Sequence, residues 1–151
     1  MTFTTIMVGV DGSKQAVRTA EVAADMAQRY GAKLLIVHVV APVFNGRGGS
    51  GLANLTRMEH WQQADSERLQ EAGRQIVHIA ELSARQKGVA NLETRVEIGD
   101  PASVIVNMAR TRNADLIVLG RRGLGTLAGL PLGSVSHKVT QVADRRCLTV
   151  A

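Results

Sequence analysis

Glycines and a serine at a fixed spacing are the residues of this chain whose types best suit ligand chemistry. Gly120 follows the apolar run 116–119. Two residues separate Gly120 from Gly123, and nine residues separate Gly123 from Gly133-Ser134. A glycine-rich loop that leads from a strand into a helix presents backbone N–H groups and the positive end of a helix dipole to an anion, most often a phosphate. Ser134 is predicted to cap that helix and to donate its hydroxyl. A glycine-rich connection that binds nothing is the alternative interpretation.

Two better-known nucleotide motifs fit this stretch less well. No GxxxxGK[ST] sequence occurs in the chain, so no lysine is placed as in a P-loop. Residues 123–128 match the loose GxGxx[GA] pattern of dinucleotide-binding proteins. That pattern calls for a βαβ unit and an acidic residue about 20 positions further on, whereas one helix and one short strand are expected here.

Length and composition indicate a single domain over residues 1–151 with an aliphatic core. The chain has 151 residues, 45% of them hydrophobic but only 3% aromatic, so the core is built from Ala, Val, Ile and Leu. A balance of 18 basic and 13 acidic residues gives a net charge of +5, which suits a polyanionic ligand. The arginines are scattered and lack interleaved aromatic residues, so no nucleic-acid partner is expected.

The cysteine content and the hydropathy favour a cytoplasmic protein. Cys147 is the single cysteine, so the chain forms no internal disulfide, and this residue is interpreted as a packed core residue. The N-terminus lacks the charged and apolar regions of a leader peptide, and no apolar run approaches the length of a membrane span. No membrane association is expected.

Strands and helices alternate along the chain. The predicted strands are residues 5–10, 33–40, 92–98, 116–119 and 147–150. The predicted helices run from Ser13 to about Tyr30, over 56–87, from Asp100-Pro101 to about Asn113, and onward from Ser134. This alternation predicts an α/β fold with a parallel sheet between two helical layers. A strand order of 3-2-1-4-5 places the first and fourth strands side by side, with their following loops at one site.

The sequence also predicts one irregular loop and the apolar residues that each helix buries. Residues 41–55 are predicted to form a mobile loop, although 46–51 reads GxGxxG, and Trp61 is interpreted as a packing anchor. The inward residues are predicted to be Leu69, Ile76, Ile79, Ala80 and Leu82 in the long helix, Val104, Ile105 and Met108 in the next, and Val135, Val139 and Val142 in the last.

Two polar residues at the strand ends have competing interpretations. His38 lies inside the second strand, and without a second ligand spaced to join it, a hydrogen-bonded core histidine is favoured over a metal site. Asp11 follows the first strand. It is interpreted either as an acceptor for an adenine or ribose or as the residue of an Asx turn that shapes the bend.

Taken together, these segments resemble the ATP-binding branch of the universal stress protein family over nearly the whole chain. The resemblance is carried by VGVDGS at 8–13, LLIVHVV at 34–40, GDP at 99–101, ADLIVLGRRG at 114–123 and GSVSHKV at 133–139. Its sharpest part is the spacing G-x2-G-x9-G-[ST] from Gly120 to Ser134.

The resemblance implies a fold, a ligand and a set of ligand-binding residues. The implied fold is the three-layer, doubly wound sandwich of the adenine nucleotide alpha hydrolase type, with five parallel strands. The implied ligand is ATP, with Mg²⁺ held only through its phosphates. Asp11 and Val39 would meet the nucleoside, Gly120 the ribose, and the later residues the phosphates. The implied set is Gly9, Asp11, Val39, Gly120, Arg121, Arg122, Gly123, Gly133, Ser134, Val135 and Ser136.

Three functions follow from these expectations. The first is an ATP-binding stress or signalling switch with slow or no hydrolysis, acting as a homodimer that pairs through its last strand. The second is an ATPase or nucleotidyl-transferring enzyme that takes a missing group from a partner or a metal. The third is an interaction module without nucleotide. The stress signal and the downstream partner are not indicated by the sequence.

Overall fold

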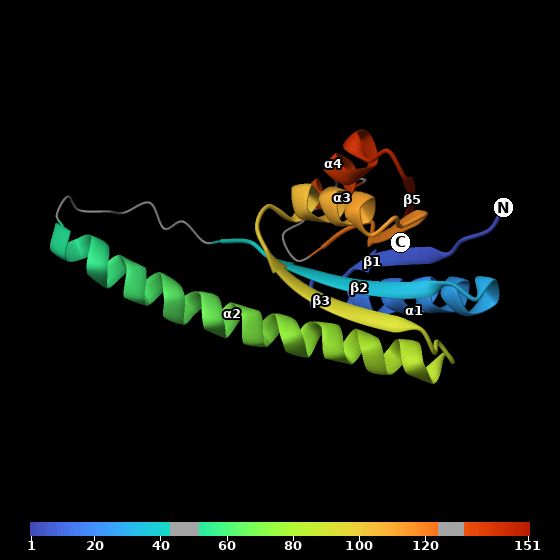
Figure 1. The fold of residues 1–151 in the computed structure, drawn as a ribbon, viewed down its shortest axis with the longest axis horizontal. Coiled ribbons are helices and arrows are strands. Elements are labelled where there is room, and N and C mark those ends of the chain that lie inside the picture. Colours follow the sequence, from blue (N-terminus) through green and yellow to red (C-terminus); the bar gives the residue numbers. More distant parts are fainter. Residues whose placement is uncertain (43–51, 124–131) are drawn as a thin grey trace.

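Five parallel strands form one sheet at the centre of the molecule (Figure 1). The structure is a computed structural model that describes residues 1–42, 52–123 and 132–151, and for residues 52–64 it describes the backbone alone. The strand order is β3-β2-β1-β4-β5, so the predicted order is confirmed. The strands are β1 (Thr5–Gly9), β2 (Lys33–Val40), β3 (Leu92–Ile98), β4 (Leu116–Gly120) and β5 (Arg146–Val150).

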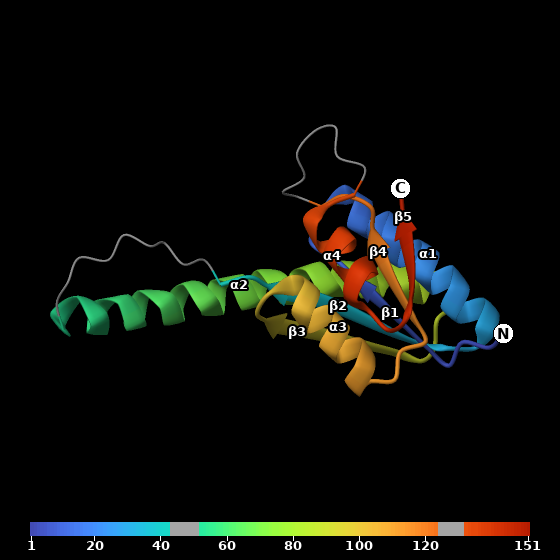
Figure 2. The same ribbon diagram turned by 90° about the horizontal axis from the view of Figure 1, so that it is seen from above.

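Helices cover both faces of the sheet, which confirms the three-layer arrangement. The helices are α1 (Lys14–Tyr30), α2 (Leu52–Gln86), α3 (Pro101–Thr111) and α4 (Ser134–Val142). Helices α1 and α2 lie on one face, and α3 and α4 lie on the other (Figures 1 and 2). Each face therefore has its own hydrophobic core, and the strands contribute alternate residues to the two.

The composition of each strand follows from its place in the sheet. Ile6, Met7 and Val8 of β1 are fully buried, because a central strand covered on both faces needs apolar residues at successive positions. Strand β3 lies at one edge, where its residues are half-buried or exposed, as its mixed polarity predicted.

Helices α1 and α3 begin near the carboxyl edge of the sheet with the N-caps that were predicted for them. The Ser13 hydroxyl accepts the Ala16 N–H at 3.1 Å and caps α1, and Asp100 accepts the Ser103 N–H at 3.0 Å and caps α3. Pro101 is the first residue of α3, a position whose N–H has no partner inside a helix. These caps fix where α1 and α3 begin relative to the strand ends.

The predicted inner face of α2 is partly wrong. Ile76 is half-buried and Ala80 is buried, as expected, but three large apolar residues of the predicted set are exposed to solvent. The exposed fractions are 39% for Leu69, 56% for Ile79 and 50% for Leu82.

Small residues form the inner face of α2 instead. Val77, Ala80 and Ala84 are 5%, 2% and 0% exposed. A Cβ atom added to Gly73 would lie 2.8 Å from Cγ1 of Val96, so this helix lies against the edge of the sheet at a distance that only glycine allows there. A pattern of large apolar residues does not reveal such a close approach.

Two further predictions about helices need correction. Helix α2 begins at Leu52, four residues before the predicted start at Thr56, so part of the region expected to be irregular is helical. In α4, Val139 is buried as predicted but Val142 is 56% exposed, because α4 ends at this residue, beyond its contact with the core. The predictions for residues 43–51, for 124–131 and for the side chain of Trp61 lie outside the described residues.

Cys147 packs against the core on the α3 and α4 face, which fits its interpretation as a packed residue. Burial raises the pKa of its thiol above the ordinary value.

None of the helices in the described ranges combines the length and the apolar character needed to cross a membrane.

Candidate functional site

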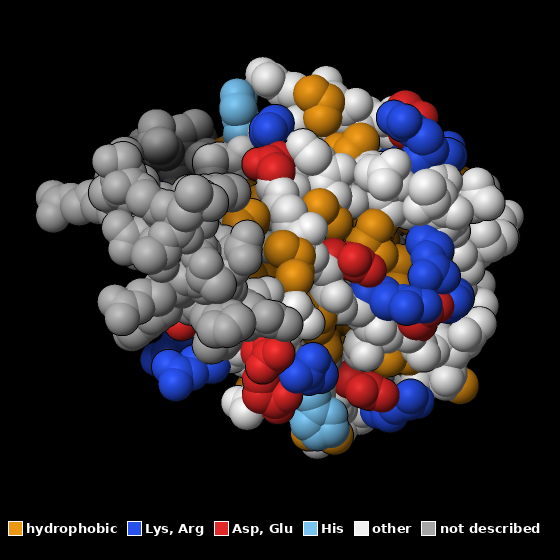
Figure 3. Space-filling model, turned by 60° about the vertical axis from the view of Figure 1, so that its left-hand side comes forward, with side chains coloured by type: hydrophobic (Ala, Val, Ile, Leu, Met, Phe, Trp, Pro, Cys, Tyr) orange, Lys and Arg blue, Asp and Glu red, His pale blue; other side chains and the backbone are white. Residues whose placement is uncertain are grey.

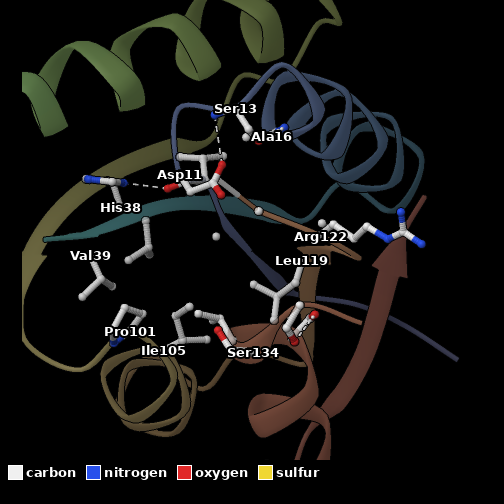
Figure 4. Close-up of a pocket in the computed structure, with 18 of the residues that line it drawn as sticks. Asp11, Ser13, Ala16, His38, Val39, Pro101, Ile105, Leu119, Arg122 and Ser134 are labelled. Carbon is white, nitrogen blue, oxygen red and sulfur yellow. Dashed lines mark hydrogen bonds between the residues drawn. The ribbon is translucent and has the colours of Figure 1, made fainter. Parts of the chain in front are cut away.

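A pocket of about 490 Å³ opens at the carboxyl ends of β1, β2 and β4 (Figure 4). This is the place where the strand order reverses, since the chain leaves β1 toward α1 on one face and joins β4 to α4 on the other. Hydrophobic side chains lie between charged ones on the face of the molecule seen from this side (Figure 3). The fold therefore places a mainly apolar cavity at the edge where ligands of such sheets bind.

The pocket brings together the residues of the predicted set from four separate parts of the chain. Its walls include Gly9, Asp11, Val39, Gly120, Arg122, Gly123, Gly133, Ser134, Val135 and Ser136. Arg121 is the member of the set that does not line it. The contacts of these residues with a ligand remain predictions.

Other lining residues were not assigned to the site from the sequence. They include His38, which closes one end, Pro101 and Ile105 from the first turns of α3, and Leu119 at the end of β4. Pro101 and Ile105 were recognised only as a helix start and an inward residue. The sequence pattern around Pro101 and Ile105 predicts that a residue is buried, but it does not predict which cavity that residue lines.

Asp11 forms the Asx turn of one interpretation and also lines the pocket. Its Oδ1 accepts the N–H of Ser13 at 3.0 Å, the hydrogen bond of an Asx turn. The same side chain lines the pocket and is drawn near its centre in Figure 4. The turn holds the carboxylate at the wall of the cavity.

Gly123 reaches across the pocket to this carboxylate. A Cβ atom added to Gly123 would overlap with Oδ2 of Asp11. The loop after β4 and the loop after β1 are thus in direct contact, as their order in the sheet predicted. A side chain at position 123 therefore requires the Asp11 carboxylate or one of the two loops to shift.

Glycine at two other lining positions serves packing inside the protein. A Cβ atom on Gly9 would lie 2.7 Å from Cδ2 of Leu119, and one on Gly120 would lie 3.2 Å from the carbonyl oxygen of Arg122. These Cβ atoms would point at protein atoms, so the glycines allow β1, β4 and the following loop to come close together. The sequence interpretation of Gly120 assigned this space to a ligand.

The hydrogen bonds of β2 leave one residue facing the open side of the sheet. Lys33 donates its N–H to the Thr4 oxygen at 2.8 Å, and the Val37 oxygen accepts the Val10 N–H at 2.9 Å, both on the β1 side. Alternate residues of a strand turn their N–H and C=O groups to opposite neighbours, so Val39 also turns toward β1.

Strand β1 has already ended at this level, since its pairing with β2 stops at Gly9 opposite Val37. Among the hydrogen bonds within the described ranges, none joins the N–H or C=O of Val39 to the β1 side. Because Val39 lines the pocket, its backbone donor and acceptor are presented there as a pair.

The start of α4 differs from the prediction in one residue. Gly133 is the N-cap, no side chain caps the helix, and Ser134 is the first helical residue rather than the cap. Glycine is acceptable at this position, although it provides no side-chain acceptor for the first N–H groups. The positive end of α4 thus faces the pocket, with the Ser134 side chain exposed beside it (Figure 4).

Arg121 joins β5 and the start of α4 through its backbone. Its N–H donates to the Val150 oxygen at 2.7 Å, and its carbonyl oxygen accepts the Gly133 N–H at 2.6 Å. The hydroxyl of Ser136 also lies 3.1 Å from the Arg121 oxygen. Arg121 and Ser136 therefore tie the start of α4 to the end of β4, a structural role that the sequence did not indicate.

The side chain of Arg122 leaves the pocket. Its guanidinium is directed away from Asp11 and past Leu119 toward the side of β5 (Figure 4). Backbone atoms of Arg122 adjoin Gly120, as noted above. Arg122 was predicted to contact phosphate, and a contact through the guanidinium requires another rotamer.

An ion pair crosses the rim beside Pro101. Lys138 of α4 lies 3.1 Å from Oδ2 of Asp100, the cap of α3. The hydroxyl and N–H of Ser103, together with Lys138, lower the pKa of Asp100 to about 2. This carboxylate is therefore ionised at neutral pH and joins the amino end of α3 to the middle of α4. Within the described ranges, no group of three or more His, Cys, Asp or Glu residues is arranged to hold a metal ion.

Comparison with known proteins identifies the family. The family model described as "Universal stress protein family" matches residues 2–151. The chain belongs to the universal stress protein family. It is 34% identical to the universal stress protein YxiE of Bacillus subtilis, over 98% of this chain and 99% of the relative. It is also 37% identical to a universal stress protein of Thermus aquaticus, over 96% of this chain and 95% of the relative.

Solved universal stress protein structures share this fold. One of them, in complex with cAMP, is 28% identical and superposes with a TM-score of 0.70, covering 100% of this chain and 98% of its own. The universal stress protein of Archaeoglobus fulgidus in complex with dAMP is 25% identical, with a TM-score of 0.69 and complete coverage of both chains. The predictions of family and fold are thereby confirmed.

Proposed function

We propose that this universal stress protein binds ATP in the pocket and acts as a nucleotide-dependent stress or signalling switch. The observation that carries the proposal is the meeting of three features in one cavity: the open backbone pair of Val39, the carboxylate of Asp11 and the amino end of α4. Each of the three suits one part of an adenine nucleotide: the base, the ribose and the phosphates.

Val39 and Asp11 support recognition of the nucleoside. Adenine carries an acceptor, N1, beside a donor, the N6 amino group, which matches an N–H and a C=O of one extended residue. The carboxylate of Asp11, held by the Ser13 N–H, suits the hydroxyl groups of a ribose. The apolar walls formed by Val37, Ile105 and Leu119 suit the faces of a base.

The phosphates are assigned to the loop after β4 and to the start of α4. The N–H groups at a helix N-terminus and the helix dipole both favour an anion, and Ser134 adds a hydroxyl donor. We assign no protein ligand to Mg²⁺, which would be held through the phosphates alone. The cAMP and dAMP complexes of the two relatives support an adenine nucleotide as the ligand class.

A switch is favoured over a fast enzyme by the chemistry of the described pocket walls. Asp11 is the acidic residue in the described lining, and it is assigned to the ribose end. Hydrolysis needs a group that orients the attacking water at the γ-phosphate. We expect bound ATP to survive prolonged incubation with Mg²⁺. Turnover faster than roughly 1 s⁻¹, the low end of ordinary enzyme rates, would instead support the ATPase or nucleotidyl-transfer function.

We also propose that the protein acts in the cytoplasm as a homodimer paired through β5. This strand lies at the edge of the sheet, and Leu148 and Val150 are half-buried there. An edge strand with unpaired backbone groups is a template for pairing with a second copy.

The first test is to identify the nucleotide that the purified protein carries and then to titrate ATP. After denaturation, chromatography should detect ATP rather than ADP or AMP. The variant Gly123→Val should weaken ATP binding by at least about tenfold, because its side chain collides with the Asp11 carboxylate and forces that group or the loop out of place. The control Leu82→Val changes an exposed residue of α2 and should bind as the wild type does. Equal affinity in a folded Gly123→Val variant, checked by its thermal unfolding, would exclude this pocket.

A further inference from the structure

The imidazole of His38 makes a hydrogen bond that a backbone N–H would make in a regular parallel sheet. Its Nδ1 lies 2.7 Å from the carbonyl oxygen of Val10 (Figure 4). A carbonyl oxygen only accepts, so Nδ1 carries the proton and Nε2 is not needed for this bond. His38 is therefore a satisfied histidine, as predicted, but the acceptor that satisfies it is an unusual one.

In a regular parallel ladder the Val10 oxygen would have a different partner. The Val10 N–H donates to the Val37 oxygen at 2.9 Å, so the backbone groups of Val10 face β2. The next hydrogen bond of such a ladder runs from the Val39 N–H to the Val10 oxygen. The His38 side chain makes that bond in place of the Val39 backbone.

We infer that His38 is a positioning residue for ligand binding, which caps β1 and thereby keeps the Val39 N–H available to an adenine base. The inference rests on the proposed function and adds a specificity role for a residue outside the predicted set. Without the imidazole, the Val10 oxygen would be left in a largely buried place without a partner, a condition that costs free energy. The smallest change that satisfies this oxygen is to extend the β1–β2 ladder by one hydrogen bond. The Val39 N–H would then donate to the Val10 oxygen and would not be available to a ligand.

Helix α2 is shaped to admit this imidazole. A Cβ atom added to Gly73 would lie 2.9 Å from Cδ2 of His38 and 2.8 Å from Cγ1 of Val96. Glycine at this helical position lets the ring stand between the sheet and α2. The position of the Val39 N–H thus depends on a contact with α2 that lies outside the pocket.

The decisive comparison uses two amide variants that differ in reach. The Nδ2 of asparagine takes nearly the place of the histidine Nδ1, whereas the longer glutamine side chain puts its donor near the place of Nε2. We expect His38→Asn to bind ATP as the wild type does, and His38→Gln and His38→Leu to raise the Kd about tenfold, the effect of one hydrogen bond lost to the base.

A second readout needs no nucleotide. Amide hydrogen exchange at Val39, followed by NMR in the nucleotide-free protein, should be fast in the wild type and in His38→Asn. It should slow at least about tenfold in His38→Gln and His38→Leu, where the ladder closes. NMR of the wild-type imidazole should also show the proton on Nδ1. A proton found on Nε2 alone would overturn the inference.

The two readouts separate this inference from the proposed function. If the wild type binds no adenine nucleotide while Val39 exchange still responds to His38→Gln, the proposed function fails and the capping role of His38 stands. If ATP binds and neither exchange nor Kd responds to His38→Gln or His38→Leu, the capping role fails alone. Should both variants fail to fold, Gly73→Ala provides the same test, because it displaces the ring and should slow Val39 exchange without changing the imidazole.

Discussion

At the scale of single residues, the pocket offers mainly backbone groups to a ligand. Val39 and the residues that begin α4 present N–H or C=O groups, and Asp11 is the carboxylate in the described lining. The backbone of Arg121 and the hydroxyl of Ser136 hold the start of α4 against the end of β4. Substitutions that change backbone position, at Gly123 or His38, are therefore expected to affect binding more than the removal of an exposed side chain.

Glu93 on β3 illustrates how single charges hold elements together. Its carboxylate lies beside Lys33, Arg95 and Arg112, which belong to β2, β3 and the end of α3. The hydrogen bond from Lys33, then that from Arg95, lowers the pKa of Glu93 from 4.5 to about 2. The folded protein therefore favours the ionised form more than the unfolded chain does.

We predict a pH-dependent effect of Glu93→Gln on the free energy of unfolding. A lowered pKa means that the ionised carboxylate stabilises the fold above pH 4.5, and that this contribution is lost as the pH falls toward 2. At pH 7 the variant should be less stable than the wild type by about 1–2 kcal/mol, because the pair is partly exposed. Urea unfolding at pH 7 and pH 2.5 measures both values. A difference that does not shrink at pH 2.5 would contradict the assignment.

At the scale of elements, the position of α2 depends on its smallest residues. Its inner face contains Gly73, Ala80 and Ala84, while Ile79 and Leu82 face solvent. The helix lies close to His38 and Val96 through Gly73. Helix α2 therefore contacts His38, one of the residues that line the pocket.

A pair of alanine substitutions on α2 tests this orientation. Val77→Ala should reduce the free energy of unfolding by about 2 kcal/mol, because the 5% exposed side chain leaves a cavity. Ile79→Ala removes a larger side chain but should change it by less than about 0.5 kcal/mol, because 56% of that side chain is exposed. Chemical denaturation measures both, and a larger loss for Ile79→Ala would reverse the assigned faces.

At the scale of the whole molecule, the sheet has an open edge at β5. The Val150 oxygen accepts the Arg121 N–H, so the backbone groups of Val150 turn inward to β4. Those of Thr149, one residue earlier, turn outward to the free edge. The same inward hydrogen bond joins β5 to the loop beside the pocket.

Thr149→Pro is predicted to convert the proposed dimer into a monomer without unfolding the chain. Proline removes an outward N–H and is tolerated on an edge strand. The control Thr149→Val keeps the N–H and should remain dimeric. Sedimentation analysis of the three proteins decides the matter. A monomeric wild type would refute dimerisation, and a dimeric Thr149→Pro would show that another surface pairs.

The order of elements and two of the helix starts were predictable from the sequence because both depend on local pattern. Apolar runs with glycine and proline at their ends predicted the strands, and Ser13, Asp100 and Pro101 marked two helix starts through caps that involve only neighbouring residues. The set of residues that the resemblance to universal stress proteins implied, Arg121 apart, lines one cavity.

Only the tertiary structure decided which atoms of these residues face that cavity. The exposure of Ile79 follows from the approach of α2 to the sheet at Gly73, a distance that no periodicity in α2 encodes. The role inferred for His38 depends on where β1 ends beside β2, which is a property of two strands and the loop between them. Local pattern specifies an element and its ends, whereas the direction of a backbone N–H at the edge of a sheet is set by the neighbour that is present or missing there.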